Sequence, residues 1–169
     1  MHRRFVLAAF ALLAFAVPAA AQQPVPDTPE GLVRALIAVH APFILDVGPG
    51  VFDSEAEIRR FFTPELAEAL LRSQRLAQES PGEIVEGTLD FDPIAGSNAP
   101  EMRDLMIEPG EVEGERSTVA VSFRREIETV VRLRYHLRVR DGRWQIEDIS
   151  SEGEGSDAWS VRRTLRMPD

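Results

Sequence analysis

Residues 130–149 read VVRLRYHLRVRDGRWQIEDI, and this stretch decides the fold. Apolar side chains occupy every second position from 131 to 139, which is the period of a β-strand with one face against a core. The dipeptide Asp141-Gly142 is typical of a two-residue hairpin turn. We therefore predict two long antiparallel strands in which Trp144 faces Val139.

The chain upstream of this hairpin divides into helices followed by strands. Helix-start signals and apolar spacing predict helices that begin near residues 28, 54 and 63, and Pro42 is expected to kink or end the first of them near Ala41. Alternation predicts strands over 104–112 and 117–123, and a short helix is expected near 158–166. This order predicts an α+β fold, with N-terminal helices packed on the concave face of a curved antiparallel sheet and a short C-terminal helix.

The predicted hairpin register assigns polar residues to its inner face. Stepping outward from the turn places Leu137 opposite Ile146 and Tyr135 opposite Asp148. We expect Tyr135 and Asp148 to face inward as neighbours. Two readings stay open: a ligand-orienting or acid/base pair, or a structural tie in which Asp148 accepts from backbone amides or caps a helix.

The outer face of the same hairpin carries a stripe of arginines and His136, which the register places opposite Glu147. The stripe fits a docking face for an acidic partner or polyanion, a ladder of salt bridges with acids such as Glu147, or a homodimer interface. Its residues are Arg132, Arg134, Arg138, Arg140 and Arg143.

Two further features are candidates for chemistry. His40 lies beside the apolar line of the first helix, which favours a core or pocket-rim histidine over a catalytic base. The stretch LDFDPIAGSN, residues 89–98, places Asp90 and Asp92 on one side of an extended segment. Pro93 favours an Asx-type turn at Asp92, and the alternative is a calcium site built from the two aspartates.

The N-terminus predicts export. Two arginines precede an apolar run over 5–17, and a small-residue cleavage site ends at Ala21. We therefore expect a signal peptide over 1–21, a linker over 22–27 and a single domain over 28–169, located in the periplasm or secreted, without stable membrane insertion after cleavage. The chain contains no cysteine, so a lipid-anchored lipoprotein, disulfides and cysteine-ligated metals are excluded.

Charge and motif content exclude several function classes. The formal net charge is −9, and it becomes −11 once Arg3 and Arg4 leave with the signal peptide. Such an acidic domain is a poor nucleic-acid binder. Phosphate-binding loops, dinucleotide fingerprints and serine nucleophile elbows are lacking in the sequence. We therefore expect no metal and no cofactor.

Four segments carry a resemblance: VHAPFI (39–44), FFTPELAEAL (61–70), LDFDPIAG (89–96) and WQIEDI (144–149). Together with the closing hairpin, they resemble the bacterial domain-of-unknown-function family numbered 3828, within the nuclear-transport-factor-2-like (cystatin-like) superfamily. The resemblance implies a cone of helices wrapped by a bent sheet. His40 departs from the pattern, where a tyrosine is expected, and no catalytic residues are implied.

The sequence favours a non-catalytic domain that binds a small ligand or a periplasmic protein. One alternative is a small hydrolase or isomerase with Asp148, Tyr135 and His40 as acid/base candidates. Another is an inhibitor or adaptor that acts through the outer arginines, with Arg132, Arg134, Arg138 and Arg140 as the partner face. The predicted ligand pocket comprises His40, Tyr135, Trp144 and Asp148.

Overall fold

The computed structural model describes residues 26–83, 85–98, 101–125, 129–153 and 158–168. Four helical segments come first: α1 (Pro29–Ile44), the 3₁₀ turn η1 (Val51–Asp53), α2 (Glu55–Phe61) and α3 (Pro64–Glu79). The strands and the last helix follow: β1 (Arg103–Glu108), β2 (Val112–Glu113), β3 (Arg116–Arg124), β4 (Val130–Arg140), β5 (Arg143–Ser151) and α4 (Val161–Thr164). The predicted signal peptide and most of the linker lie outside the described residues.

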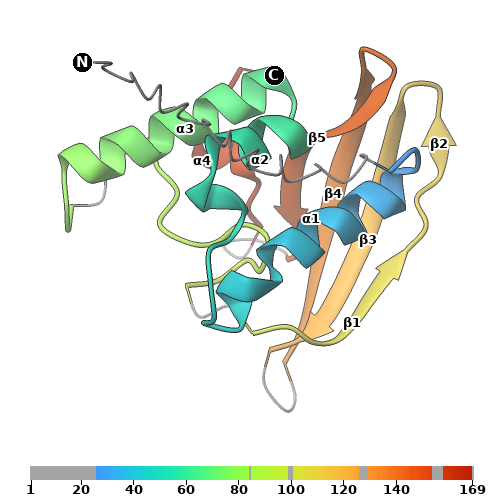
Figure 1. Ribbon diagram of the computed structural model, residues 1–169, viewed down its shortest axis with the longest axis horizontal. Coiled ribbons are helices and arrows are strands. Elements are labelled where there is room, and N and C mark those ends of the chain that lie inside the picture. Colours follow the sequence, from blue (N-terminus) through green and yellow to red (C-terminus); the bar gives the residue numbers. More distant parts are fainter. Residues whose placement is uncertain (1–25, 84, 99–100, 126–128, 154–157, 169) are drawn as a thin grey trace, which may run out of the picture.

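The sheet is antiparallel with strand order β1-β3-β4-β5, and β2 pairs with β3. Helix α1 crosses one face of the sheet, while α2, α3 and α4 gather beside β5 (Figure 1). Helices first, then an antiparallel sheet, then a short helix confirm the predicted α+β class. In the described part of the chain no helix is both long and apolar enough to cross a membrane.

Helix α1 begins where the sequence predicts and ends one turn later. The Thr28 hydroxyl accepts from the Gly31 amide at 3.1 Å, as an N-cap does. Of the two expected effects of Pro42, an end near Ala41 is wrong: the helix continues through Pro42 to Ile44, and the Leu45 amide donates to the Ala41 carbonyl at 3.0 Å. A proline removes one helical hydrogen bond, and the remaining bonds carry the last turn past it.

The hairpin turn sets the register near the tip as predicted. Asp141 and Gly142 have φ of 51° and 73°, the left-handed conformations that a tight two-residue hairpin requires. Arg140 faces Arg143, Val139 faces Trp144 and Leu137 faces Ile146. The turn therefore determines which side chains face the core in the part of the hairpin nearest the tip.

A β-bulge then shifts the register and overturns the predicted Tyr135–Asp148 pair. Beyond Leu137, Tyr135 lies opposite Ile149 and His136 opposite Asp148, so Glu147 is the extra residue of β5. The prediction that Asp148 faces inward beside Tyr135 is wrong, as is the predicted His136–Glu147 pairing. Because the extra residue inverts the alternation, Glu147 and Asp148 both lie outside the core, between buried Ile146 and Ile149.

The core lies between the helices and the covered face of the sheet. Tyr135 and Leu137 of β4 are fully buried together with Phe61 of α2 and Leu66 of α3. They belong to one contiguous cluster that also includes residues of α1 and α4. One apolar core therefore joins the helices to the sheet.

Candidate functional site

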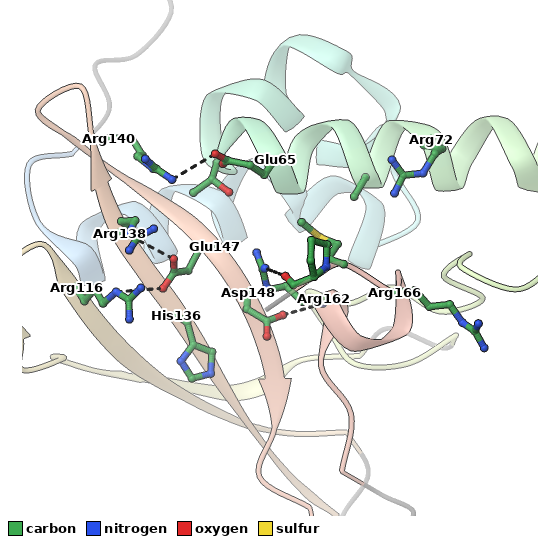
Figure 2. Close-up of a pocket in the computed structure, with 14 residues that line it drawn as sticks. Glu65, Arg72, Arg116, His136, Arg138, Arg140, Glu147, Asp148, Arg162 and Arg166 are labelled. Atoms are coloured by element: carbon green, nitrogen blue, oxygen red, sulfur yellow. Dashed lines mark hydrogen bonds and ion pairs between the residues drawn. The ribbon is translucent and has the colours of Figure 1, made fainter.

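A large open groove of about 710 Å³ lies between the outer face of the sheet and helix α3, with Met167 and Pro168 also in its lining, and Figure 2 shows its labelled side chains. We call it the arginine groove. Glu65, Glu147 and Asp148 supply its carboxylates, and His136 lies among them. Six arginines line it: Arg72, Arg116, Arg138, Arg140, Arg162 and Arg166.

Two local features bring these side chains together. The bulge in β5 turns Glu147 and Asp148 out of the core into the groove. Phe62 forms a parallel bridge with Ile146, and the Thr63 amide donates to the Ile146 carbonyl at 2.9 Å. The start of α3 is thereby held against β5, and Arg72 of α3 lines the same groove as Arg116, Arg138 and Arg140 of the sheet.

Weak ion pairs hold part of the arginine set in place. Glu147 lies 3.9 Å from Arg116 and 3.7 Å from Arg138, between their two guanidinium groups (Figure 2). Arg140 reaches Glu65 of α3 at 3.3 Å. These partly exposed pairs confirm Glu147 as a salt-bridge partner, and they contribute little to stability.

Two of the remaining arginines of the groove, Arg72 and Arg162, have no acidic partner among the described residues. Arg72 is exposed, and no described residue bonds or pairs with its side chain. The Arg162 guanidinium donates to the Pro168 carbonyl, which carries no formal charge, and Arg166 pairs with Glu86. Among the described lining residues six guanidinium groups therefore face three carboxylates, in a chain whose net charge is −9.

The predicted partner face is only partly inside this groove. Arg138 and Arg140 line it, whereas Arg134 forms a 2.8 Å ion pair with Glu152 farther along the sheet. Arg132 lines a small separate depression with Glu108 and Glu152. The outer arginines thus divide into Arg138 and Arg140, which line the groove beside α3, and Arg132 and Arg134, which lie outside its described lining.

Asp148 acts as a backbone acceptor in this structure. Its Oδ1 accepts from the Ile149 amide at 2.9 Å and from the Arg162 amide at 3.0 Å, which ties α4 to β5. This is the structural tie that the sequence left open, although it lies on the outer face. Tyr135 serves elsewhere: its hydroxyl donates to the Ile94 carbonyl at 3.0 Å inside the core. Burial raises the pKa of the Tyr135 phenol, so it stays a donor.

His136 is the only imidazole in the described lining of the groove. Its Nε2 lies 3.0 Å from the Ser150 hydroxyl and its Nδ1 3.3 Å from the Thr118 hydroxyl. Burial lowers the pKa of His136, against smaller opposing effects of Asp148 and Glu147. Ser150 does not line the groove, so this imidazole–hydroxyl contact presents no nucleophile there.

His40 is locked by two hydrogen bonds on the opposite side of α3. Its Nδ1 accepts from the Val51 amide at 3.2 Å, so the ring proton lies on Nε2, which donates to Asp92 Oδ2 at 2.8 Å. The His40 and Asp92 side chains are only 1% and 7% exposed. Because both ring nitrogens are occupied, His40 has no free lone pair to serve as a general base.

The LDFDPIAGSN segment is organised by its second aspartate. Asp92 Oδ1 accepts from the Ile94 amide at 2.9 Å, which confirms the predicted Asx-type turn. With its other oxygen on His40, Asp92 has both carboxylate oxygens engaged within the protein. No group of three or more histidine, aspartate or glutamate side chains that could hold a metal ion occurs among the described residues.

A second, smaller depression lies beside this pair, with a volume of about 270 Å³. We call it the His40 cavity. Its walls come from the end of α1, from η1, from one face of α3 and from the segment around Asp92. Its lining residues are His40, Phe43, Phe52, Asp53, Leu70, Ser73, Gln74, Ala77, Leu89, Phe91, Asp92 and Pro93.

The predicted ligand-pocket residues do not meet at one site. His40 lines the cavity named after it, while Asp148 lines the arginine groove. Tyr135 is buried in the core, and Trp144 packs partly buried against it. Sequence reasoning missed Arg72, although it lies three and seven positions beyond Ala69 and Glu65 on one face of a predicted helix, a spacing that could have shown it.

Comparisons with known proteins give only distant likenesses. No protein-family profile matches the chain, and no curated protein matches it. A chain of the type VI effector–immunity complex Tae3–Tai3 from Ralstonia pickettii is 18% identical, with a TM-score of 0.48, over 77% of this chain and 99% of that one. A phospholipid-binding protein from Ralstonia solanacearum is 10% identical, with a TM-score of 0.46, over 82% of this chain and 83% of that one. Because both TM-scores are below 0.5, neither likeness assigns a function.

Proposed function

We propose that this protein is a non-catalytic binding domain that holds an acidic segment of a protein partner in the arginine groove. The observation that carries the proposal is the excess of positive charge in the described lining, where there are six guanidinium groups and three carboxylates. Guanidinium groups bind carboxylates through paired, charge-assisted hydrogen bonds. An excess of positive charge at one place on an acidic chain creates a local field that attracts such a segment.

The form of the groove favours a peptide over a compact anion or a nucleic acid. About 710 Å³ of open space exceeds what a single phosphate fills, and the arginines come from β3, β4, α3, α4 and the residues just after α4. Glu65, Glu147 and Asp148 lie among the arginines and would repel the closely spaced phosphates of a nucleic acid. A peptide can place its acidic side chains beside the arginines and its neutral residues beside these carboxylates. Ala69 and Met167 add apolar surface for the peptide's other side chains.

The same geometry supports a binding role without catalysis. His40 has both ring nitrogens engaged, and one oxygen of Asp148, Oδ1, accepts from two backbone amides. His136 lies near the Thr118 and Ser150 hydroxyls, neither of which is in the described lining of the groove. An enzyme needs a nucleophile or base that meets a substrate in the same cavity. Export to the periplasm and kinship with the nuclear-transport-factor-2-like superfamily belong to this proposal and rest on the sequence features given above.

The test is binding of a hexaglutamate peptide, with hexaglutamine and inorganic tripolyphosphate as comparison probes. Arg72→Glu removes an exposed cation of the groove that has no acidic partner among the described residues, and we expect affinity for hexaglutamate to fall by about tenfold. Arg75→Glu is the matched control, since Arg75 is exposed on α3 outside the described lining, and it should change affinity little. High salt should weaken binding.

Three results would count against the proposal. Equal affinity for hexaglutamate and hexaglutamine would remove the electrostatic basis. Equal effects of Arg72→Glu and Arg75→Glu would place the peptide elsewhere. Tighter binding of tripolyphosphate than of hexaglutamate would show a phosphate site in place of a peptide site.

A further inference from the structure

The structure assigns a second binding site, independent of the arginine groove: we propose that the His40 cavity binds a small organic cation with an apolar body, such as an aromatic or aliphatic amine. The two sites use different faces of α3. Ala69 and Arg72 face the groove, whereas Leu70, Ser73 and Ala77 face the cavity. The failure of one site therefore leaves the other untouched.

The size and walls of the cavity fit a small apolar body. Its volume of about 270 Å³ exceeds the ~150 Å³ that accommodates a benzene molecule in a protein core. Phe43, Phe52 and Phe91 contribute aromatic surface. The His40 ring lies 5.0 Å from the Phe43 ring and 5.7 Å from the Phe52 ring, between ring centroids, so three rings form a continuous wall.

The charges around the cavity select a cation. Asp53 and Asp92 are the charged side chains in its described lining, which includes no arginine. Asp53 Oδ2 accepts from the Gly50 amide at 2.8 Å, and no described residue bonds its other oxygen. An ammonium group placed among the rings gains cation–π attraction and can donate to that free oxygen.

The neutral polar groups of the lining are used by the protein itself. Gln74 Nε2 donates to the Phe52 carbonyl at 2.7 Å, and the Ser73 hydroxyl accepts from the Leu89 amide at 2.9 Å. The His40 Nε2–H is held by Asp92. An anionic ligand therefore finds two carboxylates and few free donors, which excludes that class on electrostatic grounds.

The mouth of the cavity is apolar and open to solvent. Phe43, which lines the cavity, is 43% exposed, and Leu45 and Val47 just beyond it are 68% and 76% exposed. Phe43 therefore places a partly exposed aromatic ring at the edge of the cavity, and Leu45 and Val47 add exposed apolar side chains in the segment that follows it. A ligand that fills the cavity can cover part of this surface.

Three probes of one size and different charge test the assignment: benzylammonium, benzyl alcohol and benzoate at millimolar concentration, followed by NMR shifts of the full mature protein. We expect benzylammonium to bind about tenfold more tightly than benzyl alcohol, and benzoate not to bind. Shifts should occur at cavity residues such as Ala77 and Phe91. Absent binding of benzylammonium, or binding no tighter than that of benzoate, overturns the inference.

Two variants, each with a matched control, locate the site. Asp53→Asn keeps an acceptor oxygen for the Gly50 amide but removes the charge, so it should abolish the preference for benzylammonium over benzyl alcohol. Asp46 is exposed and outside the described lining, so Asp46→Asn should preserve this preference. Asp46 has φ of 54°, a conformation that asparagine tolerates. Ala77→Phe should block benzylammonium and benzyl alcohol, the two probes that bind, and Gln78→Phe should not. Unchanged binding in Ala77→Phe overturns the assignment.

Discussion

Replacing Asp92 by alanine should destabilise the fold strongly, and replacing Asp90 should not. Asp92 accepts from the His40 Nε2 and from the Ile94 amide, and both donors belong to residues that are at most 1% exposed. Asp90 is exposed and makes no bond with any described residue. The two aspartates lie two positions apart in the same segment, so one serves as the control for the other.

The magnitude follows from the two stranded donors. A buried donor left without an acceptor costs about 1–3 kcal/mol, so Asp92→Ala should cost about 2–5 kcal/mol. That is a large share of the roughly 5–15 kcal/mol by which domains of this size are stable. Asp92→Asn retains one acceptor oxygen and should cost about half as much. Asp90→Ala should change the free energy of unfolding by less than about 0.5 kcal/mol.

Urea denaturation of the wild type and the three variants measures these differences. With an m-value of about 2 kcal/mol/M, a loss of about 3 kcal/mol lowers the midpoint by about 1.5 M. Equal midpoints for Asp92→Ala and Asp90→Ala would refute the reasoning, because the His40–Asp92 pair would then not hold the segment. The expected order is Asp90→Ala least, Asp92→Asn intermediate and Asp92→Ala most destabilised.

Three other predictions concern the core, the pH response and export. Tyr135→Phe strands the Ile94 carbonyl and should cost about 1 kcal/mol in urea melts; no loss would show that water replaces the phenol. Burial lowers the pKa of His136 below its usual 6.5, so the unfolded chain takes up the proton first as the pH falls. The wild type should therefore lose stability relative to His136→Gln when the pH is lowered from about 8 to about 5. Parallel profiles of stability against pH would contradict this. Exported protein should begin at Gln22, and an intact mass that includes residues 1–21 would contradict cleavage.

The sequence predicts most elements and the hairpin tip, because alternation and turn chemistry are local signals. It does not predict the bulge at Glu147. The one sign of the bulge in the sequence is the spacing of Ile146 and Ile149, which are both buried although they are three positions apart, not two or four. An extra residue moves every later side chain of the strand to the opposite face of the sheet, so simple alternation assigns Asp148 to the wrong face. The His40–Asp92 contact joins residues 52 positions apart, and no local pattern indicates it.

The location of peptide binding tests the central claim most directly. In an NMR titration of the ¹⁵N-labelled mature protein with hexaglutamate, we predict that the largest amide shifts lie along the arginine groove, at Thr63, Ala69, Arg72 and His136. The same titration of Arg72→Glu should show smaller shifts at the same amides. Shifts centred on the His40 cavity or on strand β1, or no saturable shifts at any residue, would contradict an acidic partner in the arginine groove.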